Sequence, residues 1–96
     1  MNLDQLVKDK KQDILLLADK YGAKNIRIFG SVARGDFDSN SDIDFLVDFE
    51  PDVGLFEWSG FSLDLQDLLE HDVDVATEKS LKKRFRDKVL DEAVPL

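Results

Sequence analysis

The sequence predicts a small α/β (α+β) domain with its elements in the order α-β-β-α-β-α. Three observations predict it: apolar residues recur at three- and four-residue steps in some segments, they alternate at two-residue steps in others, and turn residues separate the segments. The 96 residues fit one domain, and the apolar content of 43% is close to that of globular proteins. One hydrophobic core is therefore expected.

The N-terminal part is expected to form a helix, a strand and a tight turn. Apolar residues at helical steps predict an amphipathic helix over residues 3–21, which Gly22 ends. Asn25–Phe29 alternates apolar and polar residues, which is typical of a strand, and Gly30 breaks this pattern. A short helix is expected to begin at Ser31.

The middle of the chain is expected to form a strand and a helix. Ile43–Phe49 places large apolar residues on one face at period two, which predicts the second strand. Residues 55–70 have a helical spacing that is interrupted at residues 59–60, so a helix is expected over the second half and the first half is left open. Trp58 and Phe61 are interpreted as core residues rather than as an interface.

The last part is expected to add one strand and one helix. Residues 72–77 alternate aspartate with apolar residues and predict the third strand. Ser80 is expected to cap a final helix whose apolar residues stack at four-residue steps, and Pro95 to stop it. His71 is interpreted as a loop residue.

Composition excludes several classes of protein. A formal net charge of −8 would repel a phosphate backbone, so direct nucleic-acid binding is not expected. With no cysteine and one histidine, the chain has no disulfide, no cysteine nucleophile and no thiolate or multi-histidine zinc site. No apolar run reaches the length of a membrane span, and the first residues are charged rather than signal-like, so no membrane contact and a cytoplasmic location are expected.

Charge is distributed unevenly along the chain. Residues 36–78 include fourteen acidic residues and no lysine or arginine, whereas six of the ten residues in Lys79–Lys88 are basic. A buried carboxylate in the acidic stretch must be neutralised by another part of the chain, by a metal or by protonation. The basic segment is expected either to contact a triphosphate or an acidic partner, or to form a solvated helix face.

Asp42 and Asp44 are the first candidate site residues, because they stand two apart at the start of the second predicted strand. Residues two apart in a strand point to the same side, with Cα atoms roughly 6.5–7 Å apart, so both carboxylates face one point. Two like charges at that range favour a divalent cation between them, and aspartate is a poor strand former. The pair therefore predicts a metal site rather than a purely structural role.

The third predicted strand extends this site. In residues 72–77 the valines define one face and the aspartates the other. If this strand lies beside the second, Asp74 joins Asp42 and Asp44 in a cluster of three carboxylates. Asp72 has the same parity and is the reserve. Oxygen ligands without histidine suit Mg²⁺ or Mn²⁺, and two such ions about 3.5–4 Å apart are typical of phosphoryl-transfer sites.

Gly30 and Ser31 lie upstream, where the first predicted strand runs into a short helix. Glycine permits close approach of the backbone to a ligand, and free amides at a helix start favour an anion such as a triphosphate. The Ser31 hydroxyl could donate to the same phosphates. Such turns are common, and this one gains its significance from its spacing to the aspartates.

Ten residues separate Gly30-Ser31 from Asp42-x-Asp44. This spacing, with Asp74 as a third carboxylate, resembles the signature of the DNA polymerase beta-like nucleotidyltransferase superfamily. The strings Gly-Ser-Val-Ala-Arg-Gly and Ser-Asp-Ile-Asp-Phe-Leu-Val resemble its minimal nucleotidyltransferase family, whose members are often antitoxins paired with HEPN-domain toxins. The resemblance covers essentially the whole chain. It implies one minimal nucleotidyltransferase domain over residues 1–96, with a small mixed β-sheet flanked by helices.

The resemblance implies an enzyme of EC 2.7.7 type that binds ATP with Mg²⁺ and transfers AMP to a hydroxyl. Gly30 and Ser31 would hold the triphosphate, with Arg34 and Ser41 as further nucleotide-binding residues. Arg34 is the only cation near the motif. A partner contact or a surface salt bridge is the alternative for this side chain.

The resemblance also assigns roles to the carboxylates. Asp42 and Asp44 would bind two Mg²⁺ ions, while Asp74 would ligate the catalytic ion and help to deprotonate the acceptor. In related antitoxins the acceptor is a tyrosine of the toxin, and the addition of AMP silences it.

A chain of this length has no room for a domain that binds the acceptor, so a partner must present it. The resemblance implies that this partner is a HEPN-domain toxin, with which the chain would form a hetero-oligomer. Two other hypotheses stay open: a binding module that masks a basic toxin without catalysis, and a standalone transferase that modifies a small molecule. The complete set of three carboxylates favours the enzyme over the mask.

Overall fold

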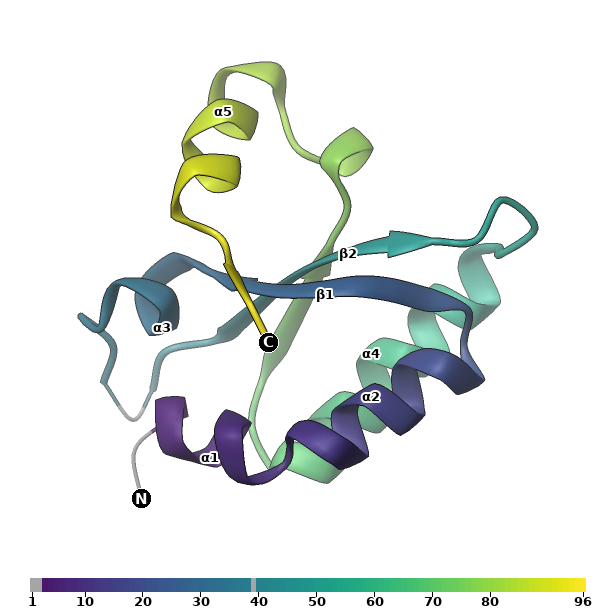
Figure 1. Ribbon diagram of the computed structural model, residues 1–96, viewed down its shortest axis with the longest axis horizontal. Coiled ribbons are helices and arrows are strands. Elements are labelled where there is room, and N and C mark those ends of the chain that lie inside the picture. Colours follow the sequence, from purple (N-terminus) through teal and green to yellow (C-terminus); the bar gives the residue numbers. More distant parts are fainter. Residues whose placement is uncertain (1–2, 39) are drawn as a thin grey trace.

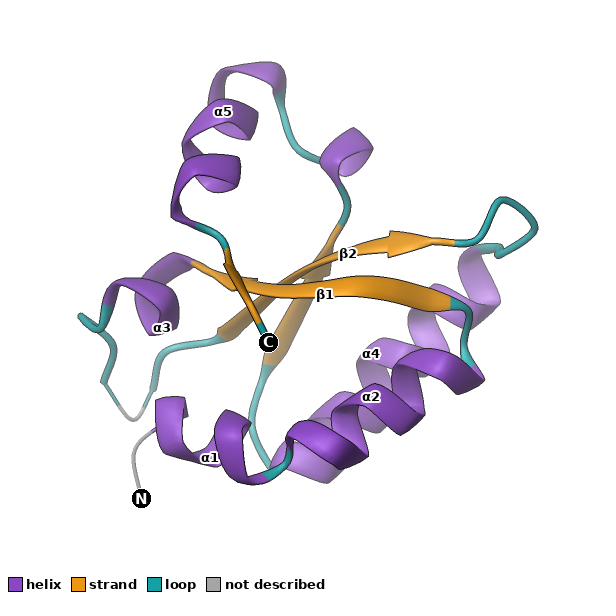
Figure 2. Ribbon diagram, in the orientation of Figure 1, coloured by secondary structure: helices purple, strands orange, loops and turns teal. Residues whose placement is uncertain are grey.

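A computed structural model describes residues 3–38 and 40–96, which form a four-stranded sheet with helices on both faces (Figures 1 and 2). The elements in chain order are α1 (Leu3–Asp9), α2 (Lys11–Lys20), β1 (Ala23–Phe29), α3 (Gly30–Arg34), β2 (Ile43–Phe49), α4 (Leu55–Leu69), β3 (Val73–Ala76), the 3-10 turn η1 (Glu78–Ser80), α5 (Lys83–Glu92) and β4 (Val94–Pro95). None of the helices in this described part is long and apolar enough to cross a membrane.

The sheet has the strand order β3-β2-β1-β4 and is mixed. β2 pairs antiparallel with β1 and parallel with β3, and β4 pairs antiparallel with β1. A parallel neighbour needs a crossover connection, which α4 supplies between β2 and β3. The small mixed sheet flanked by helices is confirmed, and the third strand lies beside the second as the site requires.

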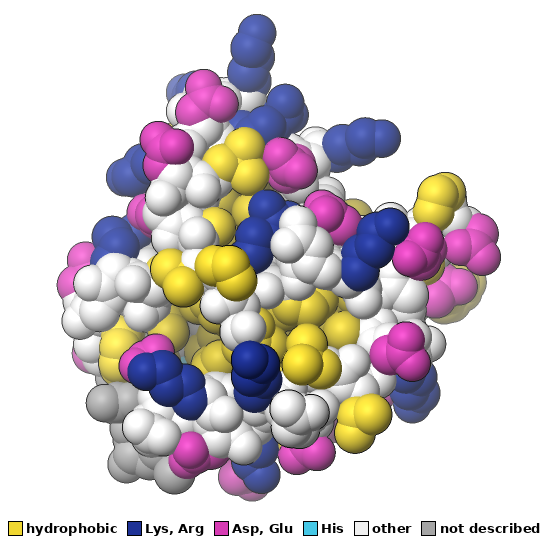
Figure 3. Space-filling model, viewed as in Figure 1, with side chains coloured by type: hydrophobic (Ala, Val, Ile, Leu, Met, Phe, Trp, Pro, Cys, Tyr) yellow, Lys and Arg dark blue, Asp and Glu magenta, His cyan; other side chains and the backbone are white. Residues whose placement is uncertain are grey.

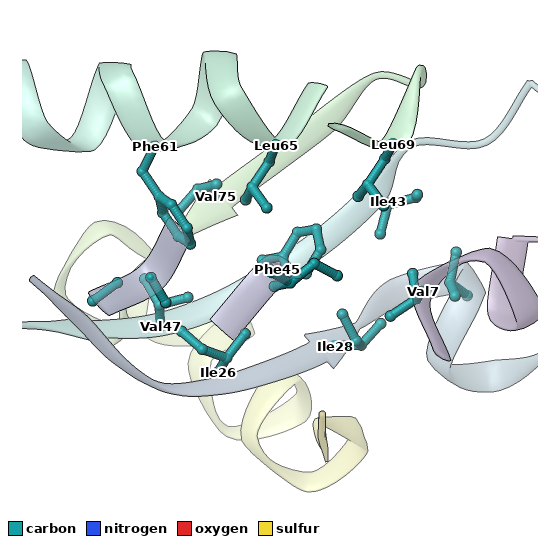
Figure 4. Close-up of a cluster of buried hydrophobic side chains, with 14 of the residues drawn as sticks. Val7, Ile26, Ile28, Ile43, Phe45, Val47, Phe61, Leu65, Leu69 and Val75 are labelled. Atoms are coloured by element: carbon teal, nitrogen blue, oxygen red, sulfur yellow. The ribbon is translucent and has the colours of Figure 1, made fainter. Parts of the chain in front are cut away.

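Each face of the sheet has its own hydrophobic cluster. The larger cluster lies under α1, α2 and α4, where Phe45 of β2 packs among side chains that include Phe61 and Leu65 (Figure 4). The smaller cluster lies under α5 and joins Leu46 to three other buried residues, which are Phe29, Ala76 and Val89. β2 is therefore apolar on both faces, because it is the central strand and helices cover both sides.

One expectation about the helices was wrong in detail, and one that was left open can now be answered. The helix expected over residues 3–21 is divided at Lys10, because α1 packs against α3 whereas α2 packs against α4 and β1. The helix α4 is continuous through residues 59–60. Gly60 lies there because Tyr21 packs against it, and a Cβ at this position would be 2.7 Å from Tyr21 Cε1.

Trp58 and Phe61 are core residues, as expected. Phe61 is fully buried, and Trp58 packs on Phe49 with ring centroids 5.6 Å apart. The indole N–H of Trp58 also donates to the Val75 carbonyl at 3.0 Å, so it covers part of the free edge of β3. His71 lies in the loop after α4, and its Nε2 is hydrogen-bonded to the Ser41 carbonyl.

The C-terminal expectations need two corrections. Ser80 does not cap the last helix: its hydroxyl and that of Thr77 each accept a hydrogen bond from the other's backbone N–H, which closes η1, and α5 begins at Lys83. Pro95 does not stop α5, which ends at Glu92, but lies in β4. A two-residue strand that contains proline has no periodic pattern, so β4 was not expected from the sequence.

Candidate functional site

Three aspartates lie where β2 and β3 begin. Asp42 immediately precedes β2, Asp44 is its second residue, and Asp74 is the second residue of β3. Asp44 and Asp74 are directly paired in the register of these two parallel strands. Because paired residues of a sheet project to the same face, the two carboxylates are neighbours, as the alternation in the sequence predicted.

The carboxylates act on one another electrostatically. Asp44 is half-buried, and this burial together with the charges of Asp74 and Asp42 raises its pKa to about 6. Arg34 opposes the rise and Glu92 adds to it. Negative charge at this site is therefore in excess of the available positive charge, which is the condition under which a divalent cation binds favourably.

Gly30 brings the turn before α3 directly against Asp44. Its φ is +73°, in the left-handed region that glycine adopts without a Cβ penalty. A Cβ at Gly30 would collide with Asp44 Oδ2 and lie 3.1 Å from its Cγ. The register agrees, since the preceding Phe29 pairs with Asp44 across β1 and β2. The turn and the carboxylates therefore form one site, which their separation in the sequence alone could not establish.

Four of the expected site residues have side chains that are free to bind a ligand. Within residues 3–38 and 40–96, no protein group forms a hydrogen bond or an ion pair with the side chains of Ser31, Asp42, Asp44 or Asp74. Asp42 and Asp74 are also exposed. Polar groups that converge at one place and have no protein partner are typical of a binding site.

Arg34 and Ser41 are engaged with protein groups instead. Arg34 Nε donates to Asp36 at 3.1 Å, and its Nη1 donates to both carboxylate oxygens of Glu92 at 3.1 and 3.3 Å. The hydroxyl of Ser41 accepts from the backbone N–H of Asp38 at 3.0 Å and belongs to the turn before β2. The salt bridge that was the alternative for Arg34 is thus present.

Glu92 is the residue of this site that sequence reasoning missed. Its Oε1 accepts a hydrogen bond from the Gly30 amide at 2.7 Å as well as the bond from Arg34. It lies 62 residues after Gly30 at the end of a helix rich in charge, where one more carboxylate gives no signal. The packing of α5 on the sheet and the pairing of β4 with β1 bring the two together.

Asp72 immediately precedes β3 and is not the residue that pairs with Asp44. Its backbone carbonyl accepts from the Ile43 amide at 3.0 Å, while the residue lines a different hollow, together with Asn40, Gln66, Asp67, Glu70 and His71. Asp74, and not Asp72, is therefore the third carboxylate that β3 pairs with Asp44.

The donor set suits a hard cation. Carboxylate oxygens without nitrogen or sulfur ligands are what Mg²⁺ and Mn²⁺ prefer, and Asp44 is held near two like charges. In the part of the chain that the structure describes, no group of three side chains from histidine, cysteine, aspartate or glutamate is arranged closely enough to hold a metal ion. Since Asp42 and Asp74 are exposed, their side chains have room to turn toward a shared cation.

An open groove adjoins the carboxylates on the outer side of β3. This β3 groove has a volume of about 480 Å³ and is lined by Leu55, Trp58, Ser59, Ser62, Leu63, Val73, Asp74 and Val75. Asp74 thus belongs both to the carboxylate cluster and to the groove. A second hollow, of about 320 Å³, lies near the C-terminus between α1 and β4, where Figure 3 shows apolar surface, and none of the three carboxylates lines it.

Comparison with known proteins identifies the family. The model of the nucleotidyltransferase domain family matches residues 10–96. The chain belongs to this family. The nucleotidyltransferase is 35% identical over 94 residues to a candidate protein adenylyltransferase of Methanocaldococcus jannaschii, MJ0435, covering 98% of this chain and 97% of that protein. It is 37% identical over 78 residues to the protein adenylyltransferase MntA of Thermococcus cleftensis, covering 81% and 79% of the two chains.

Solved structures agree on the fold of the nucleotidyltransferase. A candidate minimal nucleotidyltransferase superposes with a TM-score of 0.87 at 39% identity, covering 97% of this chain and 95% of that one. A chain from a toxin–antitoxin crystal structure with AMP-PNP superposes with a TM-score of 0.74 at 23% identity, covering 88% and 70%. The expected minimal nucleotidyltransferase fold is confirmed.

Proposed function

We propose that this nucleotidyltransferase transfers AMP from ATP to a tyrosine hydroxyl of a HEPN-domain toxin. In this way it would act as the antitoxin of that toxin. One observation carries the proposal: the Gly30 turn lies directly against Asp44, and Asp44 is paired with Asp74 across two parallel strands. The proposed phosphate site and the proposed cation site are therefore adjacent. Protein adenylyltransferases among the relatives support AMP as the transferred group.

In this proposal each site residue has one role. Gly30 and Ser31 hold the triphosphate, because Ser31 has a free hydroxyl and the turn offers backbone amides. Asp42 and Asp44 would hold two Mg²⁺ ions, and Asp74 would help to hold the catalytic ion. Arg34 and Ser41 stabilise turns that lie next to the proposed nucleotide site. When bound, Mg²⁺ would supply electrophilic activation of the phosphate and neutralisation of the developing charge.

The transfer step balances as a displacement at the α-phosphorus of ATP. The acceptor hydroxyl oxygen forms a new bond to the α-phosphorus while the bond to the α–β bridging oxygen breaks. Pyrophosphate leaves with the electron pair of that bond, and Asp74 takes the hydroxyl proton before it passes to solvent. Asp74 is suited to this task because it is exposed and faces the β3 groove from the edge of the site.

The β3 groove is the place where we propose that the acceptor enters. Its lining is largely apolar apart from Asp74 and two serines, which suits an aromatic ring that ends in a hydroxyl. Leu55, Phe56 and Leu63 of α4 are 76%, 92% and 60% exposed beside it. Large apolar side chains exposed in a group are typical of protein interfaces. A chain of the same fold in a toxin–antitoxin structure supports a toxin as the partner.

Masking without catalysis is the second candidate function, and one observation favours it. The exposed apolar side chains of α4 lie within residues 36–78, which include fourteen acidic residues and no lysine or arginine. This surface would attract a basic partner whether or not AMP is transferred. The two functions differ in whether the partner is modified covalently.

A radiolabel experiment tests the transfer. The purified chain and its purified toxin partner are incubated with Mg²⁺ and ATP that carries the label in either the α- or the γ-phosphate. Transfer of AMP predicts label on the toxin from α-labelled ATP only. Label from γ-labelled ATP would indicate phosphorylation, and the absence of label from both would favour masking. Asp74→Asn is expected to slow labelling by ~10²–10⁴-fold because a group that assists proton transfer is lost, whereas Asp72→Asn serves as the matched control with labelling unchanged.

A further inference from the structure

Glu92 connects the end of α5 to the turn that we assign to the nucleotide. Its carboxylate accepts three hydrogen bonds, one from the Gly30 amide at 2.7 Å and two from Arg34 at 3.1 and 3.3 Å. The Glu92 side chain is only 17% exposed, whereas that of Arg34 is 44% exposed. Hydrogen bonds to charged groups that are partly buried are stronger than hydrogen bonds between neutral groups.

The position of Glu92 is fixed by residues that precede it and residues that follow it in the sequence. Val89, one helical turn earlier, is buried against the second face of the sheet with Phe29 and Leu46. Val94, two residues later, pairs with Ile28 of β1. Ile28 is two residues before Gly30, so the pairing of β4 with β1 brings the Glu92 carboxylate to the Gly30 amide.

We propose that Glu92 is a positioning residue for the nucleotide, which holds the Gly30–Ser31 turn and Arg34 in the arrangement that receives the phosphates. The proposal rests on the proposed function, since it assumes that this turn binds a nucleoside triphosphate. In this proposal Arg34 has a structural role, because its guanidinium forms ion pairs with Asp36 after α3 and with Glu92 at the end of α5.

Different groups hold the turn and receive the ligand. Among the described residues, Glu92 accepts from the backbone amide of Gly30 and not from those of Ser31 or Val32. The Ser31 hydroxyl has no partner in the part of the chain that the structure describes. A phosphate can therefore bind beside Glu92 without displacing it.

Competition between Glu92 and the phosphate is the alternative, and the burial of Glu92 disfavours it. A phosphate in the place of its carboxylate would break three hydrogen bonds and leave the side chain without a partner. The same carboxylate already adds to the negative potential at Asp44. An unpaired and largely buried charge there would be costly.

The experiment measures the affinity of the whole chain for an ATP analogue that cannot be cleaved between the α- and β-phosphates, with Mg²⁺, by calorimetry. Loss of the charged hydrogen bonds in Glu92→Ala is expected to raise the Kd about tenfold. Glu92→Gln is expected to raise it less, because the amide oxygen still accepts from Gly30. The matched control is Asp91→Asn, which removes an exposed carboxylate from the neighbouring position of α5 and should leave the Kd unchanged.

Two further measurements separate positioning from a merely structural role. Steady-state kinetics should show a higher KM for ATP in Glu92→Gln with a smaller change in kcat. Thermal melts of the free variants identify any loss of folding, and Glu92→Gln keeps the test decisive if Glu92→Ala does not fold. A lowered melting temperature with an unchanged Kd and KM overturns the proposal, and so does a lower Kd, which would reveal competition. If the unaltered chain does not bind the analogue, the proposed function fails as well; if it binds and the variants bind equally, only the role of Glu92 fails.

Discussion

At Asp44, burial and neighbouring charge act in the same direction. Both raise its pKa, to about 6, because a charged carboxylate loses hydration there and faces Asp74 and Asp42. The fold therefore favours the protonated form. This contribution to stability is fully present below about pH 4, the ordinary range of an aspartate, and is lost as the pH rises through about 6.

Asp44→Asn should consequently stabilise the metal-free protein at neutral pH. A shift of this size corresponds to about 3 kcal/mol, which solvent screening at this half-exposed group reduces to about 1 kcal/mol. Urea unfolding in EDTA should show the variant more stable than the unaltered chain at pH 7.5, with the difference vanishing near pH 4. A difference that does not change with pH would show that Asp44 is not held against like charge.

Gly30 and Gly35 allow two causes of glycine preference to be separated. Both have a positive φ, +73° and +82°, but a Cβ at Gly30 would meet Asp44 while one at Gly35 would meet nothing within 4 Å. Each change to alanine should cost ~1–2 kcal/mol of stability from the left-handed backbone alone. Only Gly30→Ala should also abolish nucleotide binding, because it displaces the Asp44 carboxylate. Equal loss of binding in both variants would contradict the close approach of the turn to Asp44.

At the scale of elements, periodicity predicted the parts that bury one face and failed where burial depends on distant partners. The strand Ile43–Phe49 has the bounds expected from its alternation, because the face under α2 and α4 imposes period two, although part of its other face is buried as well. The division at Lys10 left no signal, since both halves keep a helical spacing while packing against different elements. Leu46 was not foreseen as core because the covering helix α5 lies far along the chain.

The same reasoning explains which part of the site was predictable. Asp42, Asp44 and Asp74 stand out because aspartate is unfavourable in a strand and its parity can be read from neighbouring residues. Glu92 does not stand out, because acidic side chains are common on exposed helices. Its position depends on the pairing of β4 with β1, and a strand of two residues is too short to recognise.

The β3 groove gives a prediction for α4. Leu63→Ser should reduce transfer of AMP to the toxin by roughly tenfold, because an apolar contact of the interface is lost. Leu16→Ser on α2 is the matched control: Leu16 is 69% exposed against 60% for Leu63, but it does not line the groove. Both variants should bind ATP normally and fold normally. Equal transfer by both would place the acceptor elsewhere.

At the scale of the whole molecule, an excess of negative charge governs the response to ligands. The net charge is −8, and the three carboxylates share one edge of the sheet. Mg²⁺ with ATP should therefore stabilise the fold, by ~2.7 kcal/mol at about 100 times the dissociation constant. A thermal melt at pH 7.5 checks this, with Asp44→Asn as the variant expected not to respond. An unaltered chain whose melt is insensitive to millimolar Mg²⁺ and ATP would contradict a metal–nucleotide site.

The most direct test of AMP transfer is the intact mass of the proposed toxin partner after co-expression with this chain. The unaltered chain should add one or more AMP units to the toxin and protect the cells. The double variant Asp42→Asn with Asp44→Asn should still bind the toxin, because the β3 groove is untouched, but leave its mass unchanged and the cells unprotected. Full protection by the double variant, with no adduct formed by the unaltered chain, would contradict transfer and establish masking.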